Sequence, residues 1–330
     1  MKILKNLFPA LLVITIMLIT SGWGFLVHRT AHQLAVYELP KGLQGFFYKN
    51  MDYMVYNSVR PDQRRSKDPN EATRHFIDLE VFGENAATTM PLGWDDAVAK
   101  YSKDTLQKYG YVPYYVIYMK NRLTDAFKSG NKDSILFYAA DLGHYIEDAH
   151  VPLHTSVNYD GQLTNQKGLH ALWESVVPEI EIDNYNLSSK HKATYLQQPE
   201  LSIWTAVRGS NILLKDVFEK EKEISVNFTD ATKFRIQNRN GRSVKYYTTE
   251  FAKAYAAALK NTINEQLIKS SNLVADFWYT AWVDAGKPDL ISIAKTEQKQ
   301  IKKEVKSFRK NNLIVDKYLQ SRKDDKKGDE

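Results

Sequence analysis

Along most of this chain, apolar side chains recur at the three- and four-residue spacing of an amphipathic helix. Leu136, Ala140 and Gly143 follow this spacing within residues 132–150, with titratable residues between them, and Pro152 ends the run. The same pattern predicts helices over residues 25–37, 42–57, 94–108, 113–129, 132–150, 168–176, 203–220, 247–267 and 270–286. We therefore expect an all-α fold, a single multi-helix domain.

The remaining segments lack a helical period. Residues 156–168 are rich in turn-forming side chains and are expected to form a loop between two helices. Residues 180–202 have no strong period and are expected to be irregular. Residues 223–246 combine a short β-like run with several basic side chains, and no element is assigned to them.

The first 22 residues have the pattern of a secretion signal. Lys2 and Lys5 precede the apolar run 7–19, and the small residue Gly22 ends the segment. We expect cleavage after Gly22, which makes Trp23 the mature N-terminus and the protein periplasmic or secreted. The alternative is an uncleaved membrane anchor.

Three regions follow from these patterns. They are a signal peptide (1–22), a multi-helix domain (23–290) and a charged helical or disordered tail (291–330). Residues 295–330 hold twelve Lys/Arg and seven Asp/Glu residues, a net charge of +5. Because the whole chain has a net charge of +6, the high pI belongs to the tail and the leader. The charge is therefore weak support for a nucleic-acid-binding face on the domain.

The chain contains no cysteine, which excludes disulfides, thiolate metal ligands and a lipoprotein anchor. Its apolar fraction of 43% and charged fraction of 25% are those of an ordinary globular protein. Any metal site must therefore use His, Asp, Glu or backbone atoms.

The motif HYIEDAHVPLH, residues 144–154, is the most informative stretch. His144 and Asp148 are four residues apart, so both side chains project from one helix face. After Pro152, His154 can turn back toward the same cavity. In GLHALWE, His170 and Glu174 repeat the four-residue spacing. Two helices that each present a His and a carboxylate can supply the ligands that zinc requires.

Two further clusters precede this motif. Asp62 and His75 are thirteen residues apart across an expected loop, and His28 follows Trp23 by five residues. A lone His–carboxylate pair on a helix is usually a solvated face or a hydrogen-bonded core pair. Five of the eight histidines, however, fall within these four short clusters, and together they predict a metal site.

This ordered series resembles the superfamily of zinc-dependent phospholipases C and single-strand-specific nucleases. The resemblance covers roughly residues 23–175 and implies three Zn²⁺ ions. The implied ligand sets are Asp62, His75, His144 and Asp148 for one ion, His154, His170 and Glu174 for a second, and the amino nitrogen and carbonyl oxygen of Trp23 with His28 and bridging Asp148 for the third. A free α-amino group is a ligand only after the leader is removed, so the precursor is expected to lack the third ion.

The implied activity is hydrolysis of an ester bond in a phosphodiester. A hydroxide shared by two zinc ions would attack the phosphorus. Asp62 could orient or deprotonate the attacking water, and Arg65 could pair with a phosphate oxygen. The alternative for Arg65 is a solvated loop arginine. Of the neighbouring histidines, His150 is expected to be structural and His32 to be more often structural than a ligand.

Three functions remain open at this point. A phospholipase C acting on phospholipid head groups is preferred, because the last ligand is Glu174 and cysteines are absent. The step from Trp23 to His28, the D-x-x-R of Asp62 and Arg65, and His150 instead resemble the nuclease branch, which acts on single-stranded nucleic acid or nucleotides. A non-catalytic, zinc-stabilised binding protein is the third. No obligate protein partner is implied, and we expect a monomer.

Overall fold

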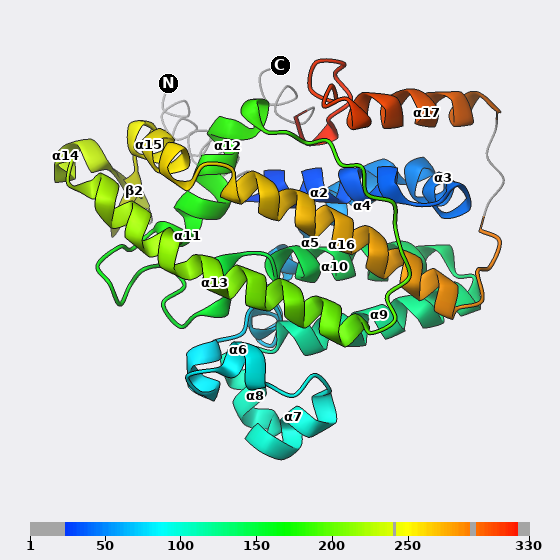
Figure 1. Ribbon diagram of the computed structural model, residues 1–330, viewed down its shortest axis with the longest axis horizontal. Helices are drawn as coiled ribbons and strands as arrows, with labels where there is room; N and C mark the ends of the chain where they lie inside the picture. Colours follow the sequence, from blue (N-terminus) through cyan, green and yellow to red (C-terminus); the bar gives the residue numbers. More distant parts are fainter. Residues whose placement is uncertain (1–23, 240–241, 291–294, 323–330) are drawn as a thin grey trace, which may run out of the picture.

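Helix α10 (Lys132–Asp148) lies in the middle of the fold, packed against α9 (Val112–Ser129), α16 (Thr262–Asp284) and α2 (Phe25–Glu38) (Figure 1). The side chain of Asn131 caps its first turn by accepting a hydrogen bond from the Ser134 amide at 2.9 Å. Twelve of its residues are buried, which makes it the core element onto which the others pack.

This computed structural model describes residues 24–239, 242–290 and 295–322. The predicted all-α fold is confirmed, since this part of the chain is helical apart from loops and one two-stranded sheet. The remaining α-helices are α3 (Lys41–Lys49), α4 (Met51–Asn57), α5 (Arg60–Arg64), α6 (Ala86–Thr89), α7 (Trp94–Tyr101), α8 (Lys103–Tyr109), α11 (Leu169–Ala171), α12 (Val177–Glu181), α13 (Pro199–Ser225), α14 (Asp230–Lys233), α15 (Thr249–Leu259) and α17 (Lys295–Arg309). The short helical turns are η1 (Ala72–Arg74), η2 (Leu79–Phe82), η3 (Pro152–Thr155), η4 (Leu172–Val176, π-helical), η5 (Ile182–Asn184) and η6 (Gln320–Arg322).

Several predicted helix boundaries differ from the structure, three of them because of a break in the chain's helical conformation. The expected helix 42–57 is split at Asn50 into α3 and α4. The expected helix 94–108 is split at Ser102, whose φ of 68° is incompatible with a continuous α-helix. The break after α15 falls at Lys260, φ 55°, so α16 starts earlier than its apolar pattern predicted. In each case the apolar period continues across a local turn, which periodicity alone does not detect.

The unassigned segment forms an antiparallel hairpin of β1 (Phe234–Arg239) and β2 (Arg242–Tyr247). In its register Phe234 pairs with Tyr247 and Arg235 with Tyr246. The hairpin lies at one end of the long α13, beside α14 and α15 (Figure 1). The β-like run in the sequence is therefore a real strand.

The charged C-terminal region packs on the domain as far as the structure describes it. Helix α17 lies against α2 and α3, with Ile301 and Phe308 buried (Figure 1). The carboxylate of Glu304 accepts hydrogen bonds from Tyr37 at 2.7 Å and from the Tyr48 hydroxyl at 2.6 Å. In the sequence, the surrounding charges obscure these inward-facing positions.

Among the described residues, no helix has the combination of length and apolar character needed to cross a lipid bilayer. The predicted signal peptide lies outside the described residues.

Candidate metal centre

The last turn of α10 presents His144 and Asp148 to the same side. His144 Nδ1 lies 2.8 Å from the carbonyl oxygen of Ser58. A carbonyl only accepts, so Nδ1 carries the proton and Nε2 is left with a lone pair. That Nε2 atom lies 3.3 Å from Asp148 Oδ2 and 3.1 Å from His75 Nδ1.

His75 and Asp62 approach this turn from a separate segment. His75 follows η1, and its Nδ1 lies 2.8 Å from Asp148 Oδ2. Asp62, on α5, places its Oδ1 3.7 Å from His75 Nδ1 and 3.8 Å from His144 Nε2. Asp62, His75 and His144 therefore form one group whose ligand atoms all lie within 4.8 Å of one another.

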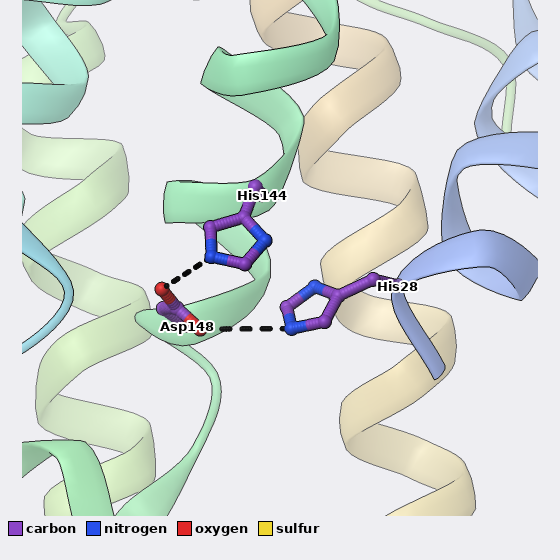
Figure 2. Close-up of side chains that lie close together, drawn as sticks. All are labelled: His28, His144 and Asp148. Atoms are coloured by element: carbon purple, nitrogen blue, oxygen red, sulfur yellow. Dashed lines mark ion pairs between the residues drawn. The ribbon is translucent and has the colours of Figure 1, made fainter. Parts of the chain in front are cut away.

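His28 reaches the same turn from α2, on the other side of His144. The two imidazole rings are stacked, with centroids 4.2 Å apart, and His28 Nε2 lies 3.8 Å from Asp148 Oδ1. Figure 2 shows both histidines directed at the Asp148 carboxylate. His28, His144 and Asp148 form a second group of converging ligand atoms.

The third group lies past the end of α10. His154, in η3, donates from Nδ1 to the carbonyl oxygen of His75 at 2.8 Å, so its Nε2 is free to act as a ligand. This Nε2 lies 3.0 Å from His170 Nε2, which lies 2.8 Å from Glu174 Oε2. His170 lies on the short helix α11, and Glu174 lies in the π-helical turn η4 that follows it directly.

These three groups fit a divalent ion such as zinc. Ligand atoms bound at about 2.0–2.1 Å in a tetrahedron lie about 3.3 Å apart. The 3.0 Å between His154 and His170, and the 3.1 and 3.3 Å around His144, are close to this spacing. Imidazole nitrogens and carboxylate oxygens are also the ligands that zinc accepts when no cysteine is present.

Glu147 supports the His28 side of the centre. It is buried, with Oε2 2.5 Å from His28 Nδ1 and Oε1 2.7 Å from His32 Nδ1. Burial alone would lower the pKa of His28, but the hydrogen bond and charge of Glu147 outweigh it and raise this pKa to about 10. A metal at His28 must therefore displace a firmly held proton or keep it from binding.

Glu71 plays the same part for His75. Its buried carboxylate lies 3.4 Å from His75 Nε2 and accepts hydrogen bonds from Arg64, Arg74 and Tyr145. Burial raises the pKa of Glu71, but His75, Tyr145 and Arg64 together hold it well below its usual range. Carboxylates behind ligating histidines set their tautomer and orientation. Sequence analysis missed both Glu71 and Glu147, although Glu71 stands four residues before His75.

The Asp148 carboxylate is held in its charged form. Burial raises its pKa, but electrostatic interactions with His144, His154 and His75 lower it well below the usual value. Glu174 behaves likewise, because His170 and His154 outweigh its burial and lower its pKa. Both carboxylates are thus available as anionic ligands.

Trp23 and Arg65 are the two remaining residues of the predicted site. Trp23 lies outside the described residues, but its neighbour Gly24 lines a small cavity of about 30 Å³ together with His28, Glu147 and Glu174. Arg65 lies at the edge of the centre, with Nη1 3.6 Å from Asp62 Oδ1 and a side chain 45% exposed.

His32 and His150 are buried and lie within hydrogen-bonding distance of backbone carbonyl oxygens. His32 Nε2 donates to the carbonyl oxygen of Ala140 at 3.0 Å. His150 Nδ1 lies 2.8 Å from the carbonyl oxygen of Ile146, and burial lowers the pKa of His150 to about 4. Neither belongs to the three ligand groups of the described residues.

A cleft of about 1230 Å³ opens onto the centre. His75, His154, His170, Glu174 and Arg65 line it. The hairpin also lines it, through Arg235, Gln237, Asn238 and Tyr246. The group of His154, His170 and Glu174 is therefore open to a ligand of substantial size, as a catalytic site requires.

No known protein-family profile matches this sequence, and no curated protein matches it. Among solved structures, the chain is similar to an alpha toxin from Clostridium absonum, with a TM-score of 0.47 and 12% sequence identity. The match covers 82% of this chain and 65% of the toxin chain, just under two thirds of the toxin's length. A likeness at this level says nothing of activity.

Proposed function

We propose that this chain is a zinc-dependent phosphodiester hydrolase with a three-ion centre. The observation that carries this proposal is the convergence of three His/carboxylate groups around the end of α10, one of which lines a large cleft. Two of these groups share His144, and Asp148 lies within 4 Å of a nitrogen atom of His28, His75 and His154.

The ligand sets are those expected from the sequence. Asp62, His75, His144 and Asp148 would hold one ion, and His154, His170 and Glu174 a second. Trp23 would complete a third with His28 and Asp148, once the leader is removed. This is supported by Gly24, the first described residue, which lines the same small cavity as His28.

When bound, zinc in such a centre polarises phosphoryl oxygens and lowers the pKa of a coordinated water. The chain's own groups do the remaining work. The carboxylate of Asp62, which is 28% exposed and lies 3.6 Å from Arg65 Nη1, can accept a hydrogen bond from the attacking water and take its proton. Arg65 can donate to a non-bridging phosphate oxygen and stabilise charge that develops there.

The buried shell keeps this geometry fixed. Glu147 orients His28, Glu71 faces His75, and the carbonyls of Ser58 and His75 fix the tautomers of His144 and His154. Ligands held by such partners need little reorganisation during the reaction.

We further propose export to the periplasm or beyond, with removal of residues 1–22. The substrate would be a phospholipid or a single-stranded nucleic acid.

The proposal is tested with purified, processed protein and a small chromogenic phosphodiester, bis(p-nitrophenyl) phosphate. We expect hydrolysis that is abolished by a chelator and restored by added zinc. Phosphatidylcholine micelles and single-stranded DNA are assayed in parallel, with diacylglycerol and mononucleotides as the products measured. A fully zinc-loaded protein that hydrolyses none of the three would overturn the proposal and favour a non-catalytic binding protein.

A further inference from the structure

The β1–β2 hairpin turns one polar face toward the cleft. Side chains alternate along a strand, so Arg235 and Gln237 lie on the same face of β1. Tyr246 is paired with Arg235 in the register and shares that face. All three line the cleft, and the Arg235 guanidinium carbon lies 6.0 Å from the centre of the Tyr246 ring.

The opposite face anchors the hairpin in the domain. Tyr247 is buried against Phe251, with ring centroids 4.9 Å apart, and its hydroxyl donates to Glu221 at 2.9 Å. Lys233, just before β1, places its Nζ 2.6 Å from the same carboxylate and 5.0 Å from the ring centre of Phe234. The base of the hairpin is therefore fixed by a buried ion pair and aromatic packing.

The same anchor reaches the loop that leads to the metal ligands. Gln166 donates to Glu221 at 2.6 Å, and Gly168, two residues before His170, donates to Asp160 at 3.1 Å. Gly168 has φ +97°, and a Cβ there would lie 3.5 Å from the Tyr247 ring. The hairpin and the His170 loop are thus tied to one buried carboxylate.

This wall has a distinct chemical character. Arg235 supplies a cation, Tyr246 a flat ring, and Gln237 and Asn238 amide donors and acceptors. On the loop, the exposed ring of Tyr159 packs edge-on to His170. Aromatic faces beside guanidinium groups and amides suit a planar base with hydrogen-bonding edges and an adjacent phosphate.

We propose that the cleft-facing side chains of the hairpin, Arg235, Gln237 and Tyr246, bind the base and neighbouring phosphate of a single-stranded nucleic acid next to the scissile bond. The assignment rests on the proposed phosphodiesterase function and specifies its substrate.

A nucleic acid fits this wall better than a zwitterionic phospholipid does. A nucleic-acid strand carries further phosphates beyond the one that is cleaved, so Arg65 and Arg235 can each meet one. Phosphatidylcholine has one phosphate, and its quaternary ammonium would be repelled by the second guanidinium.

Two variants and a matched control test the proposal in the zinc-loaded protein. Arg235→Gln removes the charge and Tyr246→Leu removes the ring. Lys245→Gln makes the same charge change on the other face of the hairpin, where Lys245 pairs with Asp230 at 3.1 Å. Each is assayed on a thymidine oligonucleotide and on bis(p-nitrophenyl) phosphate. Binding of a phosphorothioate-linked, fluorescein-labelled oligonucleotide is followed by anisotropy over a range of salt concentrations.

For Arg235→Gln and Tyr246→Leu we expect KM for the oligonucleotide to rise about tenfold. Loss of one stacking contact or one phosphate contact weakens binding by about this factor. The loss with bis(p-nitrophenyl) phosphate should be smaller than the loss with the oligonucleotide, because this substrate has a single phosphate and no base. Arg235→Gln should also lower the salt slope of oligonucleotide binding by about 0.7, the value for one phosphate contact with a single strand. Lys245→Gln should change none of these.

Equal effects of Arg235→Gln and Lys245→Gln, or an unchanged salt slope, would overturn the hairpin assignment. Cleavage of phosphatidylcholine with no cleavage of the oligonucleotide would overturn the nucleotide assignment and leave the phosphodiesterase intact. If the zinc-loaded wild type hydrolyses neither substrate nor phosphatidylcholine, the proposed phosphodiesterase function itself is contradicted.

Discussion

The Nε2 atoms of His154 and His170 lie 3.0 Å apart and face each other across the cleft floor. The two residues come from η3 and α11, joined by the loop 156–168. Asn158 holds this loop closed, accepting from the Leu163 amide at 2.7 Å and donating to Thr164 at 3.0 Å. The closed loop therefore keeps the two ligand nitrogens close together.

Asp148→Asn should disturb more than one ion, because the carboxylate of Asp148 faces both groups that contain His144. We expect the zinc content to fall by up to two ions per chain and hydrolysis to fall on the order of 10²-fold or more. Zinc is counted by elemental analysis and hydrolysis measured on bis(p-nitrophenyl) phosphate. Asp125→Asn, at an exposed position on α9, is the control and should change neither. Wild-type zinc content and activity in Asp148→Asn would show the shared assignment to be wrong.

Glu147→Gln should weaken one ion selectively. The substitution keeps the shape of the side chain but removes the charge that orients His28 and His32. Loss of such a supporting carboxylate typically weakens metal binding by about 10–100-fold. Competition with a zinc-binding dye should therefore find one weakened site and two unchanged sites. The control is Glu219→Gln on the exposed side of α13. Uniform weakening of all sites would mean that Glu147 acts on the whole fold instead.

Gly143→Ala tests the packing behind the centre. A Cβ at Gly143 would lie 2.5 Å from His32 Nε2, and His32 is fully buried with that nitrogen already hydrogen-bonded. We expect a loss of about 1–3 kcal/mol in the free energy of unfolding, measured by urea denaturation. Gly209→Ala, on α13 with no atom within 4 Å of the new methyl, should instead gain about 0.5–1 kcal/mol. If both variants were stabilised, the close approach of His32 would be contradicted.

Glu38 predicts a pH dependence of stability far from the metal ligands. Burial raises its pKa from 4.5 to about 7, although the charge of His191 lowers it in part. Between these values the unfolded chain loses this proton first, so the free energy of unfolding falls as pH rises from 4.5 to 7. Above about pH 7 the buried charge costs on the order of 3 kcal/mol.

Glu38→Gln carries no such charge. The variant should be more stable than the wild type at pH 8, by a margin that shrinks toward zero near pH 4.5. Urea unfolding at pH 5 and pH 8 measures this margin, with Glu219→Gln as the exposed control. A margin that is equal at both pH values would contradict the raised pKa.

Much of the fold follows from the helical period. The pattern of α10 is unambiguous because a buried helix must place apolar side chains every three to four residues, and Pro152 marks its end. Breaks such as Ser102 and Lys260 depend on a single residue with positive φ, which leaves the apolar period unchanged. The hairpin depends on pairing with a second strand and on anchoring by Glu221, neither of which is local in sequence.

The metal centre, like the fold, could be predicted from the sequence only in part. Spacing alone indicated that His144 and Asp148 share a face, and resemblance supplied the order in which distant ligands join them. The supporting carboxylates were missed because Glu71 and Glu147 act through tertiary contacts with Tyr145 and His28. Similarly, the inward-facing Glu304 and Phe308 of α17 are obscured by the lysines around them.

The metal content of the correctly processed protein tests the central claim most directly. Elemental analysis of the chain that begins at Trp23 should find three zinc ions per molecule. The same analysis of a precursor that retains residues 1–22 should find two. The difference arises because only a free α-amino group can join His28 and Asp148 as a ligand. A processed protein that binds no transition metal would contradict the account.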